Sequence, residues 1–108
     1  MVTRKPNESF RIFFRSKIKG IAPSAFTVLC EKTDDLTVVP LQDISVKEVK
    51  RSAQVTGDYY VGEFNFAGEG EYLLTIASET NSLLLKTIVS IKEQQMASST
   101  EEHVGIIY

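Results

Sequence analysis

The chain of 108 residues has a net charge of −2, with 43% hydrophobic and 24% charged residues. This length leaves room for one ordinary core, and the composition is typical of a globular chain rather than a disordered or membrane-spanning one. We expect no secretory signal, because the first ten residues (MVTRKPNESF) hold charges but no apolar stretch. The single cysteine, Cys30, cannot form an internal disulfide, which is typical of a reducing compartment.

The charges are separated along the chain. Residues 1–20 hold six basic residues and one acidic residue, a net charge of +5, so the remaining residues carry −7. No Lys or Arg occurs between Ala53 and Leu85, whereas this stretch contains five acidic residues. Separated charge can attract copies of the chain to one another or to other charged surfaces; the alternative is that both regions are merely solvated faces.

Apolar residues recur mainly with a period of two, which is typical of half-buried strands. The first predicted strand covers residues 9–19. Its inner face is predicted to consist of Phe10, Ile12, Phe14 and Ile18, and its outer face of Arg11, Arg15, Lys17 and Lys19. Only Phe13 breaks the alternation. We therefore expect a basic outer face on which Phe13 is exposed.

A connection with Gly20 and Pro23 leads to a second predicted strand, residues 26–32, whose inner residues are expected to be Phe26, Val28 and Cys30. Residues 36–42 are also rich in strand formers, but Pro40 cannot donate to a ladder and marks an edge or a strand end. Residues 43–52 are compatible with a short helix as well as a strand. Their β-branched neighbours favour the strand.

Three further strands are predicted within residues 59–66, 71–78 and 83–92, separated by turns. Their inner residues are expected to be Tyr60, Phe64, Phe66, Tyr72, Leu74, Ile76, Leu85, Val89 and Ile91. About seven short strands with a turn every 8 to 12 residues or so predict an antiparallel sandwich or barrel. We find no helix and no internal repeat in the sequence.

The spacing Gly68-x-Gly70-x-Tyr72-x-Leu74 resembles the corner that leads into strand F of immunoglobulin-like domains. In those domains a tyrosine near the strand start hydrogen-bonds back to the chain that enters the strand, and a core residue follows two positions later. Antibody domains have a cysteine where this chain has Leu74, and this chain contains no tryptophan. The resemblance covers about residues 9–92 by strand pattern and implies a disulfide-free, antiparallel immunoglobulin-like β-sandwich of about seven strands.

The composition changes beyond Lys92, so we divide the chain into a sandwich, residues 1–92, and an extended linker and tail, residues 93–108. The tail ends in the apolar stretch VGIIY, although a frayed terminus is normally polar. Two explanations stay open. Either the tail docks on another protein chain, or it folds back on its own domain as a further strand.

The glycine corner favours a turn over a phosphate-binding loop. A phosphate loop requires a helix after the glycines, whereas a strand is predicted here, and Glu69 and Glu71 would repel an anion. A calcium site at the turns with Asp34, Asp35 and Asp58 lacks the spacing of a calcium loop. We therefore predict no metal and no cofactor.

Few residues are candidates for catalysis. The only histidine, His103, lies in the tail, and Cys30 lies on a predicted core face, so an inert buried thiol is favoured over a Cys–His pair. The paired carboxylates lie in turns or in the tail, where no predicted burial would divide acid and base roles between them. We predict that the chain is not an enzyme.

The leading hypothesis is a non-catalytic structural module that docks into a larger protein assembly, with other protein chains, including copies of itself, as partners. The predicted partner-binding residues are Val104, Ile106, Ile107, Tyr108, Arg11, Phe13, Arg15 and Lys17. Small disulfide-free sandwiches of this kind resemble accessory components of bacteriophage particles, such as capsid decoration, neck or tail proteins. The resemblance implies a virion protein made in the host cytoplasm; a non-viral chain is expected to be cytoplasmic.

Other partners are less favoured by the sequence. Phe13 among basic residues could stack on a nucleic-acid base, but the chain is acidic overall and lacks a broad basic footprint. The alternative function is a ligand- or carbohydrate-binding sandwich, for which only Tyr59 and Tyr108 are candidate exposed aromatics. We predict no nucleic-acid, membrane or small-molecule partner.

Overall fold

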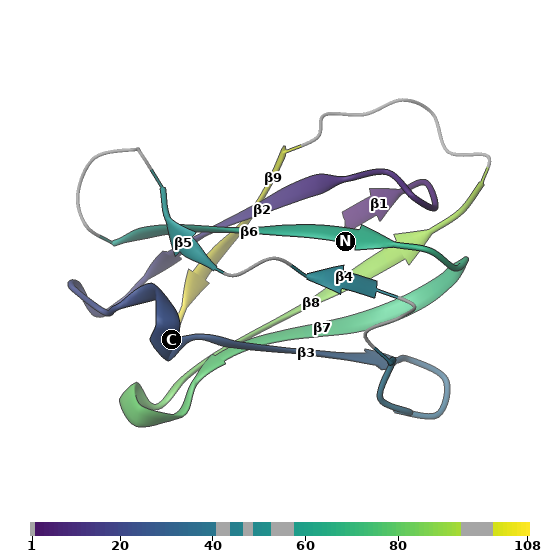
Figure 1. The fold of residues 1–108 in the computed structure, drawn as a ribbon. Coiled ribbons are helices and arrows are strands. Elements are labelled where there is room, and N and C mark those ends of the chain that lie inside the picture. The colour runs from purple at the N-terminus through teal and green to yellow at the C-terminus, as the bar shows by residue number, and fades with distance from the viewer. Residues whose placement is uncertain (1, 41–43, 47–48, 53–57, 94–100) are drawn as a thin grey trace.

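The computed structural model describes residues 2–40, 44–46, 49–52, 58–93 and 101–108, and within these ranges the protein consists of strands and two short 3-10 turns (Figure 1). The strands are β1 (Val2–Arg4), β2 (Phe10–Ser16), β3 (Thr27–Lys32), β4 (Ile44–Val46), β5 (Lys50–Arg51), β6 (Tyr59–Phe66), β7 (Gly70–Ser78), β8 (Leu83–Ile91) and β9 (Glu101–Ile107). The 3-10 turns are Pro23–Ala25 and Glu79–Asn81. The predicted all-β fold is confirmed.

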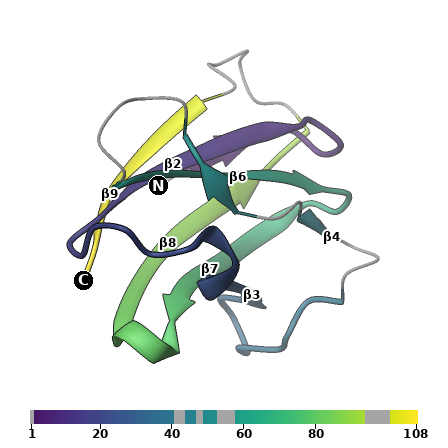
Figure 2. The same cartoon turned by 60° about the vertical axis from the view of Figure 1, so that its left-hand side comes forward.

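The strands form two sheets that face each other as a sandwich (Figures 1 and 2). One sheet has the order β1-β8-β7-β3, and the other has the order β4-β6-β2-β9, with β5 also paired to β6. If β2, β3, β4, β6, β7 and β8 are taken as strands B to G, the order follows the two sheets of an immunoglobulin-type sandwich. β9 then occupies the place beside strand B that the first strand takes in that fold.

The sandwich is mostly antiparallel, as predicted, and two of its pairings are parallel. β1 pairs with β8, where Val2 lies opposite Val89, and β9 pairs with β2, where Arg11 lies opposite Glu101. Parallel neighbours cannot be joined by a tight turn, and here each pair joins one end of the chain to a distant strand. Sequence periodicity missed β1, because a strand of three residues is too short to show a period.

The residues predicted to point inward fill the space between the sheets. Those with almost no exposed surface are Phe10, Ile12, Phe14, Tyr60, Phe64, Phe66, Leu74, Ile76, Val89 and Ile91. Gly62 lies among them on β6, where a Cβ atom would come within 2.9 Å of the Phe64 ring. Glycine at this position therefore leaves room for a core aromatic ring.

Ile18 was wrongly predicted to lie on the inner face. β2 ends at Ser16, and the Ser16 hydroxyl donates to the Ile18 carbonyl at 2.6 Å and accepts from the Ile18 N–H at 3.1 Å. This local hydrogen bonding turns the chain before the alternation reaches Ile18, whose side chain is exposed.

Where the structure describes the segment between β3 and β6, it contains short strands and no helix. Val38 forms an isolated bridge with Glu31, and Val39 is buried, whereas Pro40 is exposed. The predicted strand in residues 43–52 is confirmed as the two short strands β4 and β5 on β6. Residues 41–43, 47 and 48 lie outside the described residues.

The predicted tyrosine corner is confirmed by its hydrogen bonds. The Tyr72 hydroxyl donates to the Gly68 carbonyl at 2.9 Å and lies 3.3 Å from the Glu69 carbonyl oxygen. Gly70 has a φ of 147°, which side chains rarely permit, so the glycine is needed where the chain enters β7. The stretch between β6 and β7 therefore turns the chain and fixes it to the tyrosine.

Candidate protein-docking surface

β9 brings together the two groups of predicted partner-binding residues, which lie at opposite ends of the chain. In the parallel β2–β9 ladder, Phe13 lies opposite His103 and Arg15 lies opposite Ile106. The Lys17 N–H continues the contact by donating to the Ile107 carbonyl at 3.1 Å. We name the outward side of this ladder, formed by Arg11, Phe13, Arg15, His103 and Ile106, the β2–β9 surface.

Phe13 is the centre of the β2–β9 surface and is buried, which corrects the prediction that it is exposed. Only 8% of its surface is accessible. Its ring stacks on His103 with ring centroids 5.0 Å apart and an interplanar angle of 18°, and the Arg11 guanidinium lies 5.9 Å from its centroid. Neighbouring strands therefore cover the one aromatic residue that breaks the alternation of β2.

Arg15 is held in place beside this centre. Its Nε donates to the Asp58 carboxylate at 2.8 Å, and its guanidinium lies 5.7 Å from the centroid of Tyr59. The hydrogen bond from Arg15 to Asp58 is the main cause that raises the pKa of Arg15. Asp58 itself is buried, so the ion pair holds Arg15 at a fixed place on the surface, where 49% of the Arg15 side chain remains exposed.

A bulge in β9 decides which of its residues face outward. Between the pairs Phe13–His103 and Arg15–Ile106, β9 contains one residue more than β2, and Gly105 has a φ of 102°. An extra residue shifts the alternation of side chains by one position. Ile106 therefore lies outside, 40% exposed, and Ile107 lies inside.

The inward residues of β9 belong to the core of their own domain. Ile107 has no accessible surface and lies in a cluster with Phe14, Tyr60 and Ile76, while Val104 is half-buried against the same cluster. Of the two explanations for the apolar tail, the structure shows the one in which residues 101–107 fold back as a further strand. Residues 94–100 of the predicted linker lie outside the described residues.

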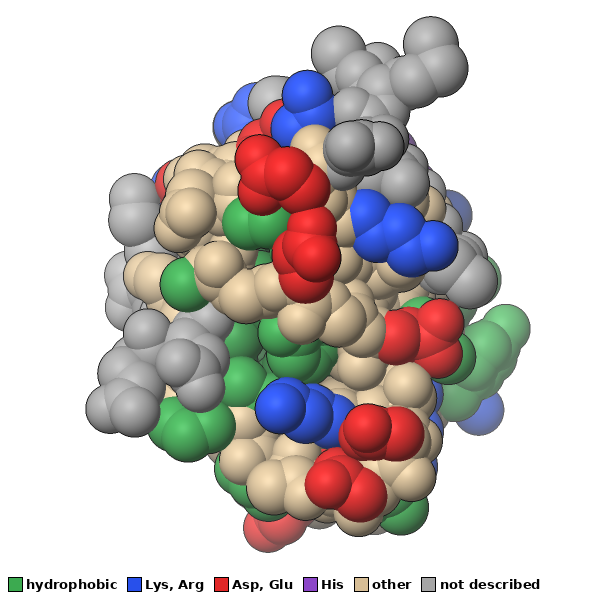
Figure 3. Space-filling model, turned by 90° about the vertical axis from the view of Figure 1, so that its right-hand side faces the viewer, with side chains coloured by type: hydrophobic (Ala, Val, Ile, Leu, Met, Phe, Trp, Pro, Cys, Tyr) green, Lys and Arg blue, Asp and Glu red, His purple; other side chains and the backbone are tan. Residues whose placement is uncertain are grey.

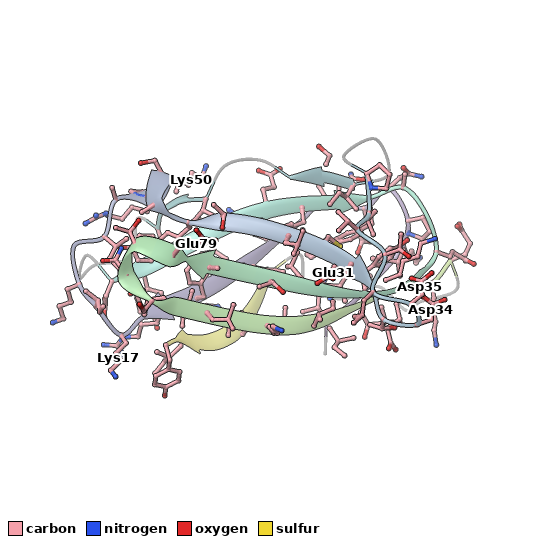
Figure 4. All side chains as sticks on the ribbon, turned by 90° about the horizontal axis from the view of Figure 1, so that it is seen from below. Lys17, Glu31, Asp34, Asp35, Lys50 and Glu79 are labelled. Atoms are coloured by element: carbon pink, nitrogen blue, oxygen red, sulfur yellow. The ribbon has the colours of Figure 1, made fainter. Side chains whose placement is uncertain are left out.

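The last residue links β9 to the opposite sheet. The Tyr108 carbonyl accepts from the Leu84 N–H of β8 at 2.6 Å, and 65% of Tyr108 is exposed. Lys17 lies at the same end of the molecule, as Figure 4 shows. Tyr108 and Lys17 thus border the β2–β9 surface rather than forming its centre.

The separation of charge along the sequence is only partly a separation in space. Lys17 and Lys50 lie at one end of the sandwich and Asp34 and Asp35 at the other, but Glu79 lies at the basic end (Figure 4). A view onto the end opposite Lys17 shows acidic and basic side chains interspersed (Figure 3). At that end the Thr37 N–H donates to the Asp35 carboxylate at 2.9 Å, and hydrogen bonding by Thr37 lowers the pKa of Asp35.

Cys30 and His103 are not brought together. Cys30 is buried in the core as predicted, and burial raises the pKa of its thiol to about 12. His103 lies on the outer side of the other sheet, exposed beside Phe13.

The acidic turns considered for calcium are also apart. Asp34 and Asp35 follow β3, which ends opposite Tyr72 near the start of β7. Asp58 precedes β6 at the opposite end, where it binds Arg15. Among the described residues, no group of three His, Cys, Asp or Glu side chains could hold a metal ion. In the same residues, no helix is long and apolar enough to cross a membrane.

Sequence reasoning missed two residues that shape the β2–β9 surface. The sequence marks His103 as a candidate catalytic residue and Asp58 as part of a candidate calcium site. In the structure, His103 stacks on Phe13 and Asp58 accepts from Arg15. A lone glycine within a strand-like run is a signal of a bulge, so Gly105 could have indicated the change of parity in the tail. No local signal indicates that the strand pairs with β2.

A shallow hollow on this surface has a volume of about 210 Å³ and is lined by Phe13, Phe14, Arg15, Tyr59, His103, Gly105 and Ile106. Pockets for small organic ligands commonly have volumes of about 300 to 1,000 Å³ and enclose most of the ligand. The hollow is open and smaller than this range. No protein-family model, curated protein or solved structure matches the chain.

Proposed function

We propose that this protein is a non-catalytic structural module that docks into a larger protein assembly through the β2–β9 surface. The observation that carries the proposal is the convergence of residues from both ends of the chain on one outer face. Arg11, Phe13 and Arg15 come from β2, and His103 and Ile106 come from β9. The sequence predicts Arg11, Phe13, Arg15 and Ile106 as partner-binding residues in two separate groups. The β2–β9 ladder brings these groups together with His103 on one surface.

The chemistry of the surface favours a protein partner over a small ligand. Arginine and aromatic residues are enriched in protein interfaces and account for much of the binding energy there. Here two arginines flank a stacked Phe13–His103 pair, and the exposed Ile106 adds an apolar contact. A ligand- or carbohydrate-binding site would need a deeper pocket than the shallow hollow beside Tyr59.

Docking in this proposal is passive. The sandwich acts as a rigid body, the positive charges of Arg11 and Arg15 orient the partner's approach, and the apolar residues hold it. Many copies in a symmetric particle would bind more strongly together than one copy does alone. A bacteriophage particle, which the sequence resemblance implied, is the assembly we propose, with the chain as a decoration, neck or tail component.

The test measures incorporation into the native assembly. A tagged wild-type chain is expressed in its native source, the assemblies are cross-linked and purified, and the chain in them is quantified by mass spectrometry. We expect the variant Arg11→Glu/Ile106→Lys to be incorporated about tenfold less or lower, because both the attraction and the apolar contact are lost. Leu36→Lys is the matched control, because Leu36 is exposed and lies in the turn after β3, away from this surface.

Two results would overturn the proposal. Equal incorporation of the wild type and the β2–β9 variant would show that this surface does not dock. If the wild-type chain is recovered only as a free protein from sources whose assemblies are intact, then the chain is not a structural component of them. Circular dichroism of each variant controls for folding.

A further inference from the structure

The outer face of the four-stranded sheet carries apolar side chains on three neighbouring strands, beside polar residues such as Glu31, Thr75 and Lys86. Leu29 on β3 is 43% exposed and Leu84 on β8 is 52% exposed. Leu73 and Ala77 on β7 and Ile88 on β8 are half-buried. We name these five residues the β3–β7–β8 face; in Figure 4 the three strands lie toward the viewer.

The pairing of the strands arranges these residues as apolar pairs on either side of the Thr75–Lys86 pair. Across β7 and β8, Leu73 lies opposite Ile88 and Ala77 lies opposite Leu84, and Leu29 of β3 lies opposite Thr75 of β7. The other side of the same strands forms the core, with Leu74, Ile76 and Leu83 among its residues. Exposed apolar residues that are rimmed by polar residues mark interaction sites on protein surfaces.

We propose that a second copy of this chain covers the β3–β7–β8 face, so that the protein forms a symmetric homodimer. A pair of opposite charges on this face fits a second copy. Glu31 of β3 lies opposite Leu73, and Lys86 of β8 lies opposite Thr75, two residues further along the central β7. A twofold axis parallel to β7 places β3 of each copy over β8 of the other, and each Glu31 then lies near the partner copy's Lys86.

The size of the face is consistent with a weak dimer. With strands about 4.8 Å apart and a rise of about 3.3 Å per residue, the residues of β1, β3, β7 and β8 cover roughly 430 Å² in projection. A standard interface buries about 800 Å² of accessible surface on each partner, and side-chain relief makes the accessible surface larger than the projection. The exposed Tyr108, joined to Leu84 by its carbonyl, lies next to the face and adds contact area.

The β2–β9 surface is a poorer place for two copies to meet. Its arginines already have acidic neighbours within the chain, since Arg15 is paired with Asp58 and Arg11 lies opposite Glu63, so they supply no charge pair between copies. The dimer therefore uses the opposite side of the sandwich. This inference goes beyond the proposed function. The homodimer leaves the β2–β9 surface of each copy free, so one dimer offers two docking sites to the assembly.

Analytical ultracentrifugation of the full chain tests the dimer, over about 10 μM to 1 mM, a range that reveals weak to moderate self-association. We expect a concentration-dependent dimer of the wild type, weakened about tenfold or more by Leu29→Lys or Leu84→Lys because each buries a charge in the apolar contact. Ile106→Lys and Leu36→Lys, on other surfaces, should leave the dimer unchanged. Thermal unfolding of each variant confirms that the monomer folds.

A charge exchange gives a second, independent measurement. Glu31→Lys and Lys86→Glu should each weaken the dimer, and the double variant should restore most of the lost association, because the charges are then exchanged rather than removed. A wild type that stays monomeric at every concentration overturns the inference. So does a dimer that Ile106→Lys disrupts and Leu84→Lys does not, or a double variant weaker than both single variants. None of these outcomes depends on incorporation into the native assembly, so the two proposals fail separately.

Discussion

Ile106 and Ile107 are neighbours in β9 and lie on opposite sides of the sheet, one exposed beside Arg15 and the other wholly buried in the core. The bulge at Gly105 sets this arrangement, because an extra residue moves Ile107 inward. The two residues are chemically identical and adjacent. Substitution of Ile107 therefore tests the role of β9 in the fold, and substitution of Ile106 tests its role in binding.

The loss of unfolding free energy on replacing each isoleucine tests which of the two lies in the core. Ile107→Ala should lower the free energy of unfolding by about 2 to 5 kcal/mol, because it leaves a cavity in the core. Ile106→Ala should change it by no more than about 0.5 kcal/mol, as for other exposed sites. Urea unfolding followed by circular dichroism measures both. Equally small effects would contradict the position of Ile107 between the sheets.

Gly105→Ala should destabilise the protein by about 1 to 2 kcal/mol, because alanine adopts the positive φ of this position only with strain. The matched control is Gly68→Ala, where an added Cβ atom would meet only the Tyr72 hydroxyl at an ordinary 3.5 Å. Differential scanning calorimetry measures both variants. A smaller loss for Gly105→Ala than for Gly68→Ala would argue against the bulge.

Tyr72→Phe should lower the free energy of unfolding by about 1 kcal/mol or somewhat more, because the Gly68 and Glu69 carbonyls lose their shared donor. Tyr59→Phe is the control, since Tyr59 is half-buried at the start of β6 and takes no part in this corner. Chemical unfolding measures the difference. No loss for Tyr72→Phe would mean that the corner does not stabilise the sandwich.

The thiol of Cys30 should react very slowly with a thiol reagent at pH 8 in the folded protein and rapidly in urea. Burial raises its pKa from 9.0 to about 12, so the folded protein holds almost no thiolate at pH 8. Between these two pKa values the unfolded chain releases the proton and the folded chain keeps it. Stability should therefore fall as the pH rises from 9.0 toward about 12, and Cys30→Ala should remove that part of the pH dependence.

Local alternation was enough to predict which residues of β2, β6 and β7 form the core. Phe10, Phe64 and Leu74 follow a period of two, and in a strand this period places side chains on one face whatever the strand pairs with. The tyrosine corner was predictable for a similar reason. Tyr72 and Gly68 are four positions apart, so their hydrogen bond depends on local geometry.

The exposed fraction of Phe13 could not be predicted from its neighbours in the sequence. Its position on the outer face of β2 follows from parity, but its burial follows from His103 and Arg11, which cover it in the folded protein. The exposed fraction of an outward side chain depends on the neighbouring strand. Nothing near Phe13 in the sequence identifies that neighbour.

The all-β fold, the inner face of the main strands, the corner at Tyr72 and the burial of Cys30 were predictable from the amino-acid sequence. The parallel pairing of β9 with β2, and which of Ile106 and Ile107 faces inward, became known only from the folded arrangement of the strands. Side-chain alternation and turns depend on near neighbours along the chain. Pairing between the two ends of a chain is instead set by which sheet edge remains open when the other strands have packed.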